Sequence, residues 1–296
     1  MRSLKFLLVI ATLFLFANMA NGQKVRVKPE KEGVRSFSLM TYNIRHGLGM
    51  DGKIDIERIA REIEIVNPDV VTLQEVDSKT ERSNGSDNAA ELAKLLGYYK
   101  IFGRAMDYNG GEYGNAILFK EIPMAQSVIE LPGKDEPRCM LVVEFSEYIV
   151  ATCHLSLDSE SRIQSCYKIN DVISEISSGK FRKDGKKVFS GSDKPIFLTG
   201  DFNALPEDSD IFVMSKAFYW LSKSKSFTYP SNRPNKILDY IFLYKNKAGL
   251  KLMKEFDKGS KGMASWVQPE EMASDHRPVL LTILWDKEFV VEEISQ

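Results

Sequence analysis

Polar side chains that could bind a metal ion and cleave a phosphoester stand at the ends of several apolar segments of this sequence. Asn43, Glu75 and His154 each close a run of mostly apolar residues that is typical of a strand. Further members of the set are Asp201, Asn203, Asp239, Asp275 and His276. One such residue usually just meets solvent or caps a turn. Asp239 is harder to explain in that way, because a charge inside an apolar run is costly unless it is paired.

The oxygen atoms in this set suit a hard divalent cation. Magnesium prefers oxygen ligands and keeps several waters, so one or two carboxylates can hold it. Glu75, together with Asn43 and Asp275, offers such a site. The cysteines and histidines do not have the spacing of a structural zinc site, which favours a hard cation.

The other polar residues match the needs of phosphoester hydrolysis. That reaction requires an oriented water, a proton acceptor or donor, and donors to the phosphate oxygens. Asp201 could orient or deprotonate the water, and Asn203 could donate to phosphate. His154 and His276 could supply further donors, with Asp239 holding one imidazole in the required tautomer.

Strands and helices that alternate along the chain must bring these residues together. Helical spacing of apolar residues predicts helices from Asp55 to Asn67, at residues 87–96 and at residues 159–176. Apolar runs predict strands near residues 37–42, 69–73, 99–102, 115–119, 139–145, 148–153, 195–198, 237–243 and 278–284. This order indicates an α+β or a layered α/β architecture, and the pattern alone does not choose between them.

Length and charge indicate one large domain that is not built to grip nucleic acid. The chain has 296 residues, 40 basic and 41 acidic, and shows neither an internal repeat nor a long linker. Proteins that hold nucleic-acid backbone usually have a basic excess, so nucleic acid is not the favoured partner. The basic run at residues 180–187 precedes a strand whose far end carries Asp201, and we expect it to be a solvated loop.

The first 22 residues have the pattern of a signal peptide, with Arg2 and Lys5 before an apolar run and small residues near Gly22. The apolar run is shorter than a membrane span requires, so we expect export and cleavage rather than an uncleaved anchor. A flexible lead-in at residues 23–36 and a catalytic domain at residues 37–296 would follow. The three cysteines, Cys139, Cys153 and Cys166, are expected to be small buried groups without a disulfide framework.

Six short motifs resemble those of the endonuclease/exonuclease/phosphatase superfamily and occur in the order found in that family. They are MTYNI at residues 40–44, LQEV at 73–76, TCHL at 152–155, GDFN at 200–203, LDYI at 238–241 and SDHRP at 274–278. The resemblance covers about residues 37–285. It implies an α+β fold, a four-layer α/β/β/α sandwich with two packed, mainly antiparallel sheets.

The same resemblance implies a chemical role for each residue of the set. Mg²⁺ or Mn²⁺ would be held mainly by Glu75, with Asn43 nearby, and Asp201 and Asn203 would position water and phosphate. His276 would act as a base or stabilise charge, oriented by one of the aspartates Asp239 and Asp275, and His154 would serve as a phosphate donor or acid.

The motifs are most similar to those of compact bacterial exported members, of the deoxyribonuclease- or sphingomyelinase-like kind. The favoured function is therefore metal-dependent hydrolysis of a small or lipid-linked phosphoester outside the cytoplasm, by a protein expected to be a monomer. A secreted nuclease for DNA or RNA and a catalytically idle binding protein on the same fold are the alternatives. Candidates for lining the same cleft are Arg45, His46, Arg104, Asn115, Arg138 and Arg162.

Overall fold

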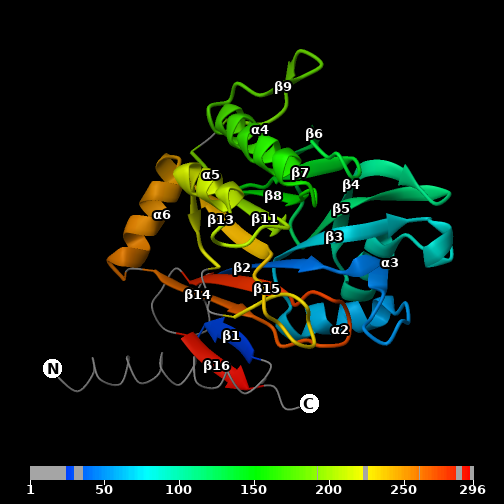
Figure 1. Cartoon of the computed structure of the whole chain (residues 1–296). Helices are drawn as coiled ribbons and strands as arrows, with labels where there is room; N and C mark the ends of the chain where they lie inside the picture. Colours follow the sequence, from blue (N-terminus) through cyan, green and yellow to red (C-terminus); the bar gives the residue numbers. More distant parts are fainter. Residues whose placement is uncertain are drawn as a thin grey trace.

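Two six-stranded sheets pack face to face, and helices cover the outer face of each (Figure 1). This confirms the expected four-layer sandwich. The computed structural model describes residues 25–29, 36–191, 193–222, 226–259, 261–284 and 289–293. The predicted signal peptide, residues 1–22, lies outside this part of the chain. Within it, none of the helices has the length and apolar character needed to cross a membrane.

The first sheet combines strands from both ends of the chain. Its spatial order is β14 (Gly262–Val267), β15 (Val279–Leu284), β2 (Ser36–Asn43), β3 (Val70–Ser78), β5 (Gly111–Phe119) and β4 (Tyr99–Tyr108). The neighbours β2 and β3 are parallel, and the other neighbouring pairs are antiparallel. Asn43 therefore ends its strand at the same edge of the sheet as the carboxyl-terminal half of β3.

The second sheet repeats this arrangement with one parallel pair. Its order is β12 (Phe218–Trp220), β13 (Asp239–Tyr244), β11 (Ile196–Asp201), β8 (Ile149–His154), β7 (Arg138–Glu144) and β6 (Ala125–Leu131). Here β8 and β11 are the parallel neighbours. Both sheets are thus mainly antiparallel, as expected, although strands β6, β12 and β14 were not predicted.

Capping aspartates start the helices that cover the sheets. Asp55, Asp87 and Asp158 each accept a backbone hydrogen bond at the N-terminus of α2 (Ile56–Val66), α3 (Asn88–Leu96) and α4 (Ser159–Ser177). The helices α2 and α3 cover the first sheet, whereas α4 and α5 (Ser209–Ala217) cover the second (Figure 1). A further helix, α6 (Lys247–Asp257), contributes Leu252 to the layer between the sheets. Neither α5 nor α6 was predicted from the sequence.

Alternation along the strands separates the inner layer from the outer layers. In β2, Leu39 faces the other sheet, while Met40 and Tyr42 pack beneath α2. The layer between the sheets is largely apolar and includes Val70, Ile117, Val143, Phe197, Ile241 and Leu281. Burial of this layer holds the two sheets together.

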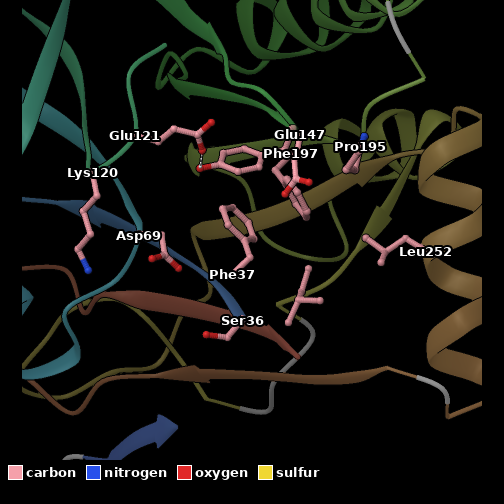
Figure 2. A pocket seen from close by; sticks show the side chains of 11 residues that line it. Ser36, Phe37, Asp69, Lys120, Glu121, Glu147, Pro195, Phe197 and Leu252 are labelled. Atoms are coloured by element: carbon pink, nitrogen blue, oxygen red, sulfur yellow. Dashed lines mark hydrogen bonds between the residues drawn. The ribbon is translucent and has the colours of Figure 1, made fainter. Parts of the chain in front are cut away.

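A cavity of about 520 Å³ opens at the end of this layer where β2 begins, opposite to Asn43 (Figure 2). Its rim is charged, but the charges have partners in the protein. Asp69 accepts hydrogen bonds from Ser38, Glu121 accepts one from Tyr148 at 3.4 Å, and Lys120 donates to a backbone carbonyl at 2.8 Å. The charged groups at this cavity therefore serve the structure.

Three peripheral features bear on the expectations from the sequence. Five residues of the segment expected to be a flexible lead-in form β1 (Val25–Pro29), which pairs with β16 (Phe289–Glu293). The basic run forms an exposed hairpin of β9 (Arg182–Lys183) and β10 (Lys186–Lys187), consistent with a solvated loop. All three cysteines are free and buried.

Candidate active site

The polar residues singled out from the sequence meet where the parallel strands end. Asn43 is the last residue of β2, and His154 and Asp201 are the last residues of β8 and β11, side by side in register. Asp239 pairs with Asp201 from the antiparallel strand β13. It is the first residue of that strand rather than an interruption within it, which differs from the sequence-based assignment.

Glu75 reaches the same place through an irregularity in β3. The register with β5 shifts between Leu73 and Val76, and Glu75 has a φ of 54°. Bulges of this kind re-aim side chains next to active sites, and a left-handed glutamate is strained. The side chains of Gln74 and Glu75 therefore do not follow the regular alternation between the two faces of the sheet. Gln74 points between the sheets, while Glu75 accepts a hydrogen bond from Asn43 at 2.9 Å.

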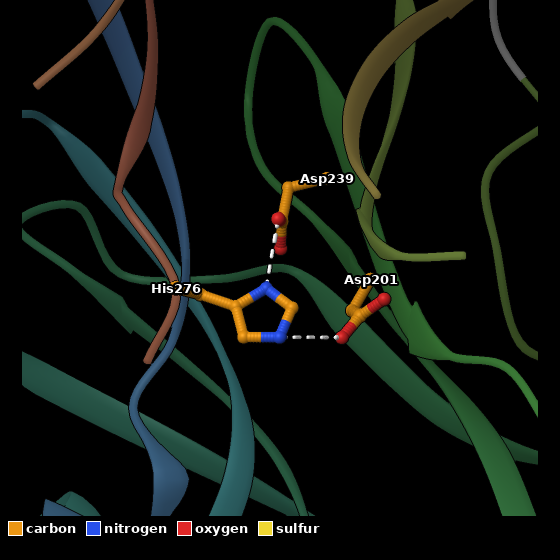
Figure 3. A group of neighbouring side chains, drawn as sticks. All are labelled: Asp201, Asp239 and His276. Carbon is orange, nitrogen blue, oxygen red and sulfur yellow. Dashed lines mark hydrogen bonds and ion pairs between the residues drawn. The ribbon is translucent and has the colours of Figure 1, made fainter. Parts of the chain in front are cut away.

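A continuous chain of polar contacts crosses from one sheet to the other. Asn43 Nδ2 lies 2.9 Å from Glu75 Oε1 and 3.0 Å from Asp201 Oδ2. His276 Nδ1 lies 2.9 Å from Asp239 Oδ2, and its Nε2 lies 3.5 Å from Asp201 Oδ2 (Figure 3). His276 precedes β15 of the first sheet, whereas the two aspartates belong to the second. The site is therefore divided between the two sheets.

Burial and nearby charges shift the pKa values of His276 and His154 in opposite directions. Burial alone would lower the pKa of His276, but the carboxylates of Asp239 and Asp201 outweigh it and raise that pKa. Burial lowers the pKa of His154, and the charge of Arg138 lowers it further. The pKa of Asp201 is raised, first by burial and then by Asp239. The site thus combines a cationic imidazole, a neutral imidazole and a carboxylate of increased basicity.

Asn203 holds the neutral histidine. Its backbone φ of 48° lies in the left-handed region, which asparagine tolerates better than most residues. The amide Nδ2 lies 3.1 Å from His154 Nε2 and donates to the Leu155 carbonyl at 2.9 Å. Both amide hydrogens are thus engaged within the protein, so the expected donation from Asn203 to phosphate does not fit this geometry. Its carbonyl oxygen is the atom left for water or substrate.

A divalent cation fits the site beside Glu75. Removal from water raises the pKa of this glutamate, and the neighbouring Asp275 raises it further, against the hydrogen bond from Asn43. A cation would offset both effects, and all three side chains carry the hard oxygen atoms that magnesium prefers. A second group that could bind a metal is the buried set of Asp201, Asp239 and His276, whose ligand atoms lie within 4.8 Å of one another. There, however, His276 already bonds to Asp239.

The cavity above these residues is about 580 Å³ in volume and carries more acidic than basic side chains. Glu75, His154, Asp201, Asn203, Asp275 and His276 line it, as does Arg138. The lining residues that the sequence did not reveal are Arg82, Met106, Tyr108, Tyr113, Asp135, Glu136, Leu157, Tyr229, Lys236 and Leu238. Many of them lie on loops or strand ends without a distinguishing sequence pattern, so only the fold assigns them to the cavity.

Of the six further candidates for lining the cleft, two lie beside the site, and the others have structural partners. Arg45 Nε is 3.5 Å from Asp275 Oδ2, and His46 follows it, but neither lines the cavity. Arg104 pairs with Asp107 and Glu112, Asn115 donates to the Cys139 carbonyl, and Arg162 bonds to Asp210 and the Leu157 carbonyl. Arg138 is held by Asp135 and Glu136. Of the six candidates only Arg138 lines the cavity, so the expectation is not met for the following five: Arg45, His46, Arg104, Asn115 and Arg162.

One wall of the cavity depends on a buried ion pair. Asp77, fully buried, accepts two hydrogen bonds of 2.7 Å from Arg82, and others from Thr80 and Ser83. The guanidinium of Arg82 lies 4.4 Å from the ring centre of Tyr108. Asp77 therefore fixes the cationic and aromatic side chains of this wall.

Replacing Asp77 by asparagine is expected to lower the Tm at pH 7, and the loss should shrink in acid. Burial would raise the pKa of Asp77, yet the hydrogen bonds from Arg82, Thr80 and Ser83 hold it below its ordinary value. The stabilisation is thus complete above the ordinary carboxyl pKa of about 4 and disappears as pH falls through the lower folded-state value. Thermal melts of both proteins between pH 7 and pH 3 measure this. A gap that does not change with pH would contradict it.

Gly200 lets β11 approach β8 closely enough to place His154 beside Asp201. A Cβ atom at this position, where φ is 138°, would lie 1.9 Å from the Cys153 carbonyl oxygen. We expect Gly200→Ala to push the strands apart and reduce turnover by about tenfold or more, because catalysis is sensitive to small displacements. Steady-state kinetics and thermal melts measure the change, and an alanine variant with wild-type kcat would show that this contact is not needed.

Comparison with known proteins agrees with the fold. The chain matches the Endonuclease/Exonuclease/phosphatase family over residues 40–276, a range that contains every residue of the polar chain described above. The match spans most of the sequence, so the chain belongs to this family. Its members are hydrolases that act on phosphoester bonds, and they generally depend on a divalent metal.

Individual relatives are distant. An uncharacterised protein of Caenorhabditis elegans is 26% identical over 209 residues, which cover 66% of this chain and 62% of that protein. An endonuclease/exonuclease/phosphatase from Beutenbergia cavernae superposes with a TM-score of 0.60 at 21% identity, covering 84% of this chain and 71% of that one. A mannosyl-6-phosphatase from Bacteroides thetaiotaomicron has a TM-score of 0.60 at 17% identity, covering 83% and 99%. At these identities the structures establish the fold alone.

Proposed function

We propose that this chain is a divalent-metal-dependent hydrolase that cleaves a small or lipid-linked phosphoester outside the cytoplasm. The observation that carries the proposal is the polar chain from Glu75 through Asn43 and Asp201 to His276 and Asp239, in which Glu75, Asp201 and His276 line a cavity. Buried charges of this kind destabilise a fold unless they are paired, and a binding module does not require the whole set. Export is supported by the signal-peptide pattern of residues 1–22.

Each polar group has a place in the hydrolysis of a phosphoester. Glu75 and Asp275, with Asn43, would hold Mg²⁺ or Mn²⁺, which neutralises charge on the phosphoryl oxygens. Asp201 accepts a proton from the attacking water, and burial increases its basicity for that step. Asp239 fixes the ring of His276 through Nδ1, so that Nε2 can donate to a phosphoryl oxygen as charge develops.

Asn203 and His154 complete the binding of water and substrate. The carbonyl oxygen of Asn203 can accept a hydrogen from the attacking water, because both amide hydrogens are engaged elsewhere. His154 Nε2 accepts from Asn203, so the neutral ring carries its proton on Nδ1. Within the described residues that Nδ1 is buried and has no hydrogen-bond partner, so donation to the leaving group or to phosphate would require the ring to turn this atom toward the cavity.

The charges around the cavity favour a compact substrate over a nucleic acid. Five carboxylates line the cavity: Glu75, Asp135, Glu136, Asp201 and Asp275. Of the positively charged lining side chains, Arg82 and Arg138 are held by carboxylates of the protein, and His276 lies against Asp239 and Asp201. A strand of DNA or RNA requires an extended basic track, and this lining does not supply one.

The proposal is tested with purified protein lacking residues 1–22. It is assayed with Mg²⁺, with Mn²⁺ and with EDTA on chromogenic phosphomonoesters and phosphodiesters, sphingomyelin, glycerophosphodiesters, RNA and plasmid DNA. Metal-dependent turnover of a small or lipid ester supports it. Preferred cleavage of plasmid DNA or RNA would replace it with the nuclease alternative, and no turnover on any substrate would leave a binding protein.

A further inference from the structure

One layer below the catalytic residues, the interior between the sheets changes from apolar to polar. Thr41 and Thr72 are paired neighbours on β2 and β3 of the first sheet, and Thr152 and Thr199 are paired neighbours on β8 and β11 of the second. Gln74 joins them from β3. All five side chains are completely buried. They form a polar layer at the centre of the sandwich, which is defined here as these five residues.

Hydrogen bonds in the polar layer connect the two sheets directly. Thr72 Oγ1 lies 2.8 Å from Thr199 Oγ1, and Gln74 Nε2 donates to Thr152 Oγ1 at 2.9 Å. Gln74 Nε2 also lies 3.1 Å from Thr41 Oγ1 within its own sheet. Hydrogen bonds have a preferred distance and direction, whereas apolar contacts do not. The polar layer therefore fixes the position of one sheet against the other more strictly than the apolar layer does.

The polar layer lies directly under the catalytic residues. Asn43, His154 and Asp201 each follow a member of the layer by two positions, in the pairs Thr41 and Asn43, Thr152 and His154, and Thr199 and Asp201. Residues two apart on a strand lie on the same face at a spacing of about 6.6 Å. Glu75 follows Gln74 immediately. Members of the polar layer thus precede four catalytic residues on the same strands.

The active site is divided between the two sheets, so its geometry depends on the position of one sheet against the other. The contact of Asn43 with Asp201 at 3.0 Å and that of His276 with Asp201 at 3.5 Å both cross the boundary between the sheets. A displacement of about 1 Å in a catalytic site can reduce the rate by about 100-fold. Valine in place of the threonines would fill the same space, and a buried hydrogen-bonded pair is no more stabilising than apolar groups of the same shape. Stability alone does not account for the hydroxyl groups.

We propose that the contacts of Thr72 with Thr199 and of Gln74 with Thr152 are positioning contacts that hold the two halves of the active site in register. These residues do not touch substrate and act through the strands that carry Asn43, Glu75, His154 and Asp201. Where this inference is tested by turnover, it rests on the proposed function.

The double variant Thr72→Val/Thr199→Val tests the inference. Removing both hydroxyls together leaves neither without the other, and it takes one side-chain donor, at 3.1 Å, from the Met40 and Ala151 carbonyls. Its Tm should therefore fall only slightly below that of the wild type. Its kcat should fall by about tenfold or more with KM little changed, because alignment rather than binding is lost. The conservative variant Thr72→Ser keeps the hydroxyl and should retain most of kcat.

Val70→Ala is the matched control. Val70 lies two residues before Thr72 on the same inner face of β3 and belongs to the apolar layer. Its truncation should lower the Tm and leave kcat near that of the wild type. Equal loss of kcat in Val70→Ala and in the double variant would overturn the inference, because general loosening would then explain both. Wild-type kcat in the double variant would also overturn it.

Crystal structures separate this inference from the proposed function. If the double variant loses register, the distance between Asn43 Nδ2 and Asp201 Oδ2 should exceed hydrogen-bond range, compared with 3.0 Å here. If the wild type hydrolyses no phosphoester, the proposed function fails, and this distance alone decides the inference. An unchanged distance in the double variant would refute the positioning role whatever the activity.

Discussion

Glu75→Gln is expected to reduce turnover by about 1,000-fold or more and to leave the protein folded, because a metal contributes several kcal/mol to the transition state. Glutamine keeps the shape of the side chain and an oxygen for Asn43, which donates to Glu75 at 2.9 Å. It removes the negative charge that would hold the cation between Glu75 and Asp275. Calorimetric titration with Mn²⁺ and steady-state kinetics should show weaker metal binding and loss of kcat together.

A buried carboxylate far from the cavity provides the control for this substitution. Glu144, 1% exposed at the end of β7, bonds to Ser190 and to Lys194 at 2.9 Å. Glu144→Gln leaves a nearly buried lysine without its charged partner, although Lys194 still donates to the Phe145 carbonyl, so the Tm should fall while kcat stays unchanged. Wild-type turnover in Glu75→Gln, or equal loss of turnover in both variants, would refute the assignment of Glu75.

His276→Ala is expected to lower kcat by about 100- to 10,000-fold, the range for loss of a positioned acid or base. The substitution removes the donor that faces Asp201 and leaves the carboxylates of Asp201 and Asp239 facing each other without the imidazole. Circular dichroism and thermal melts confirm folding before the rates are compared. Asp239→Asn should also lower kcat, because Asp239 both orients the ring of His276 and raises its pKa.

The third histidine of the chain serves as the matched control. His46 lies on the turn Arg45–Gly47 that follows Asn43, and it does not line the cavity. Burial, followed by the nearby charge of Arg82, lowers its pKa to about 4, so it is neutral at pH 7. His46→Ala should keep near-normal kcat. A loss as large as that of His276→Ala would show that the two histidines cannot be distinguished by their geometry.

The sequence revealed the site best where a catalytic residue ends a regular strand. Asn43, His154 and Asp201 each close an apolar segment, and their strands lie in the two parallel pairs, whose ends meet at one edge of each sheet. Which segments are neighbours could not be deduced from the pattern, because strand order depends on the packing of the whole chain. The resemblance to a known family supplied the four-layer architecture, and the structure supplied the order of the strands.

The positions of some side chains around the site have physical causes that the sequence pattern does not record. Arg162 is close in sequence to His154, but its donors bond to Asp210 and to the Leu157 carbonyl, so it supports the loop after β8. Proximity along the chain did not imply a shared cavity. Glu75 owes its orientation to a bulge, and a bulge leaves no clear mark on the alternation of residues. The cavity wall at Arg82 depends on Asp77, a partner buried behind it.

The position of β15 has a consequence for the newly made chain. This strand lies inside the first sheet, between β14 and β2, and His276 stands just before it. During synthesis the amino-terminal part emerges first, so β2 has no partner on that side until the last part of the catalytic region appears. Pairing strands that are so far apart in sequence is also intrinsically slow. A chain that ends before His276 therefore lacks both an interior strand of the first sheet and the imidazole of the site, so the proposed hydrolysis requires synthesis to continue through β15.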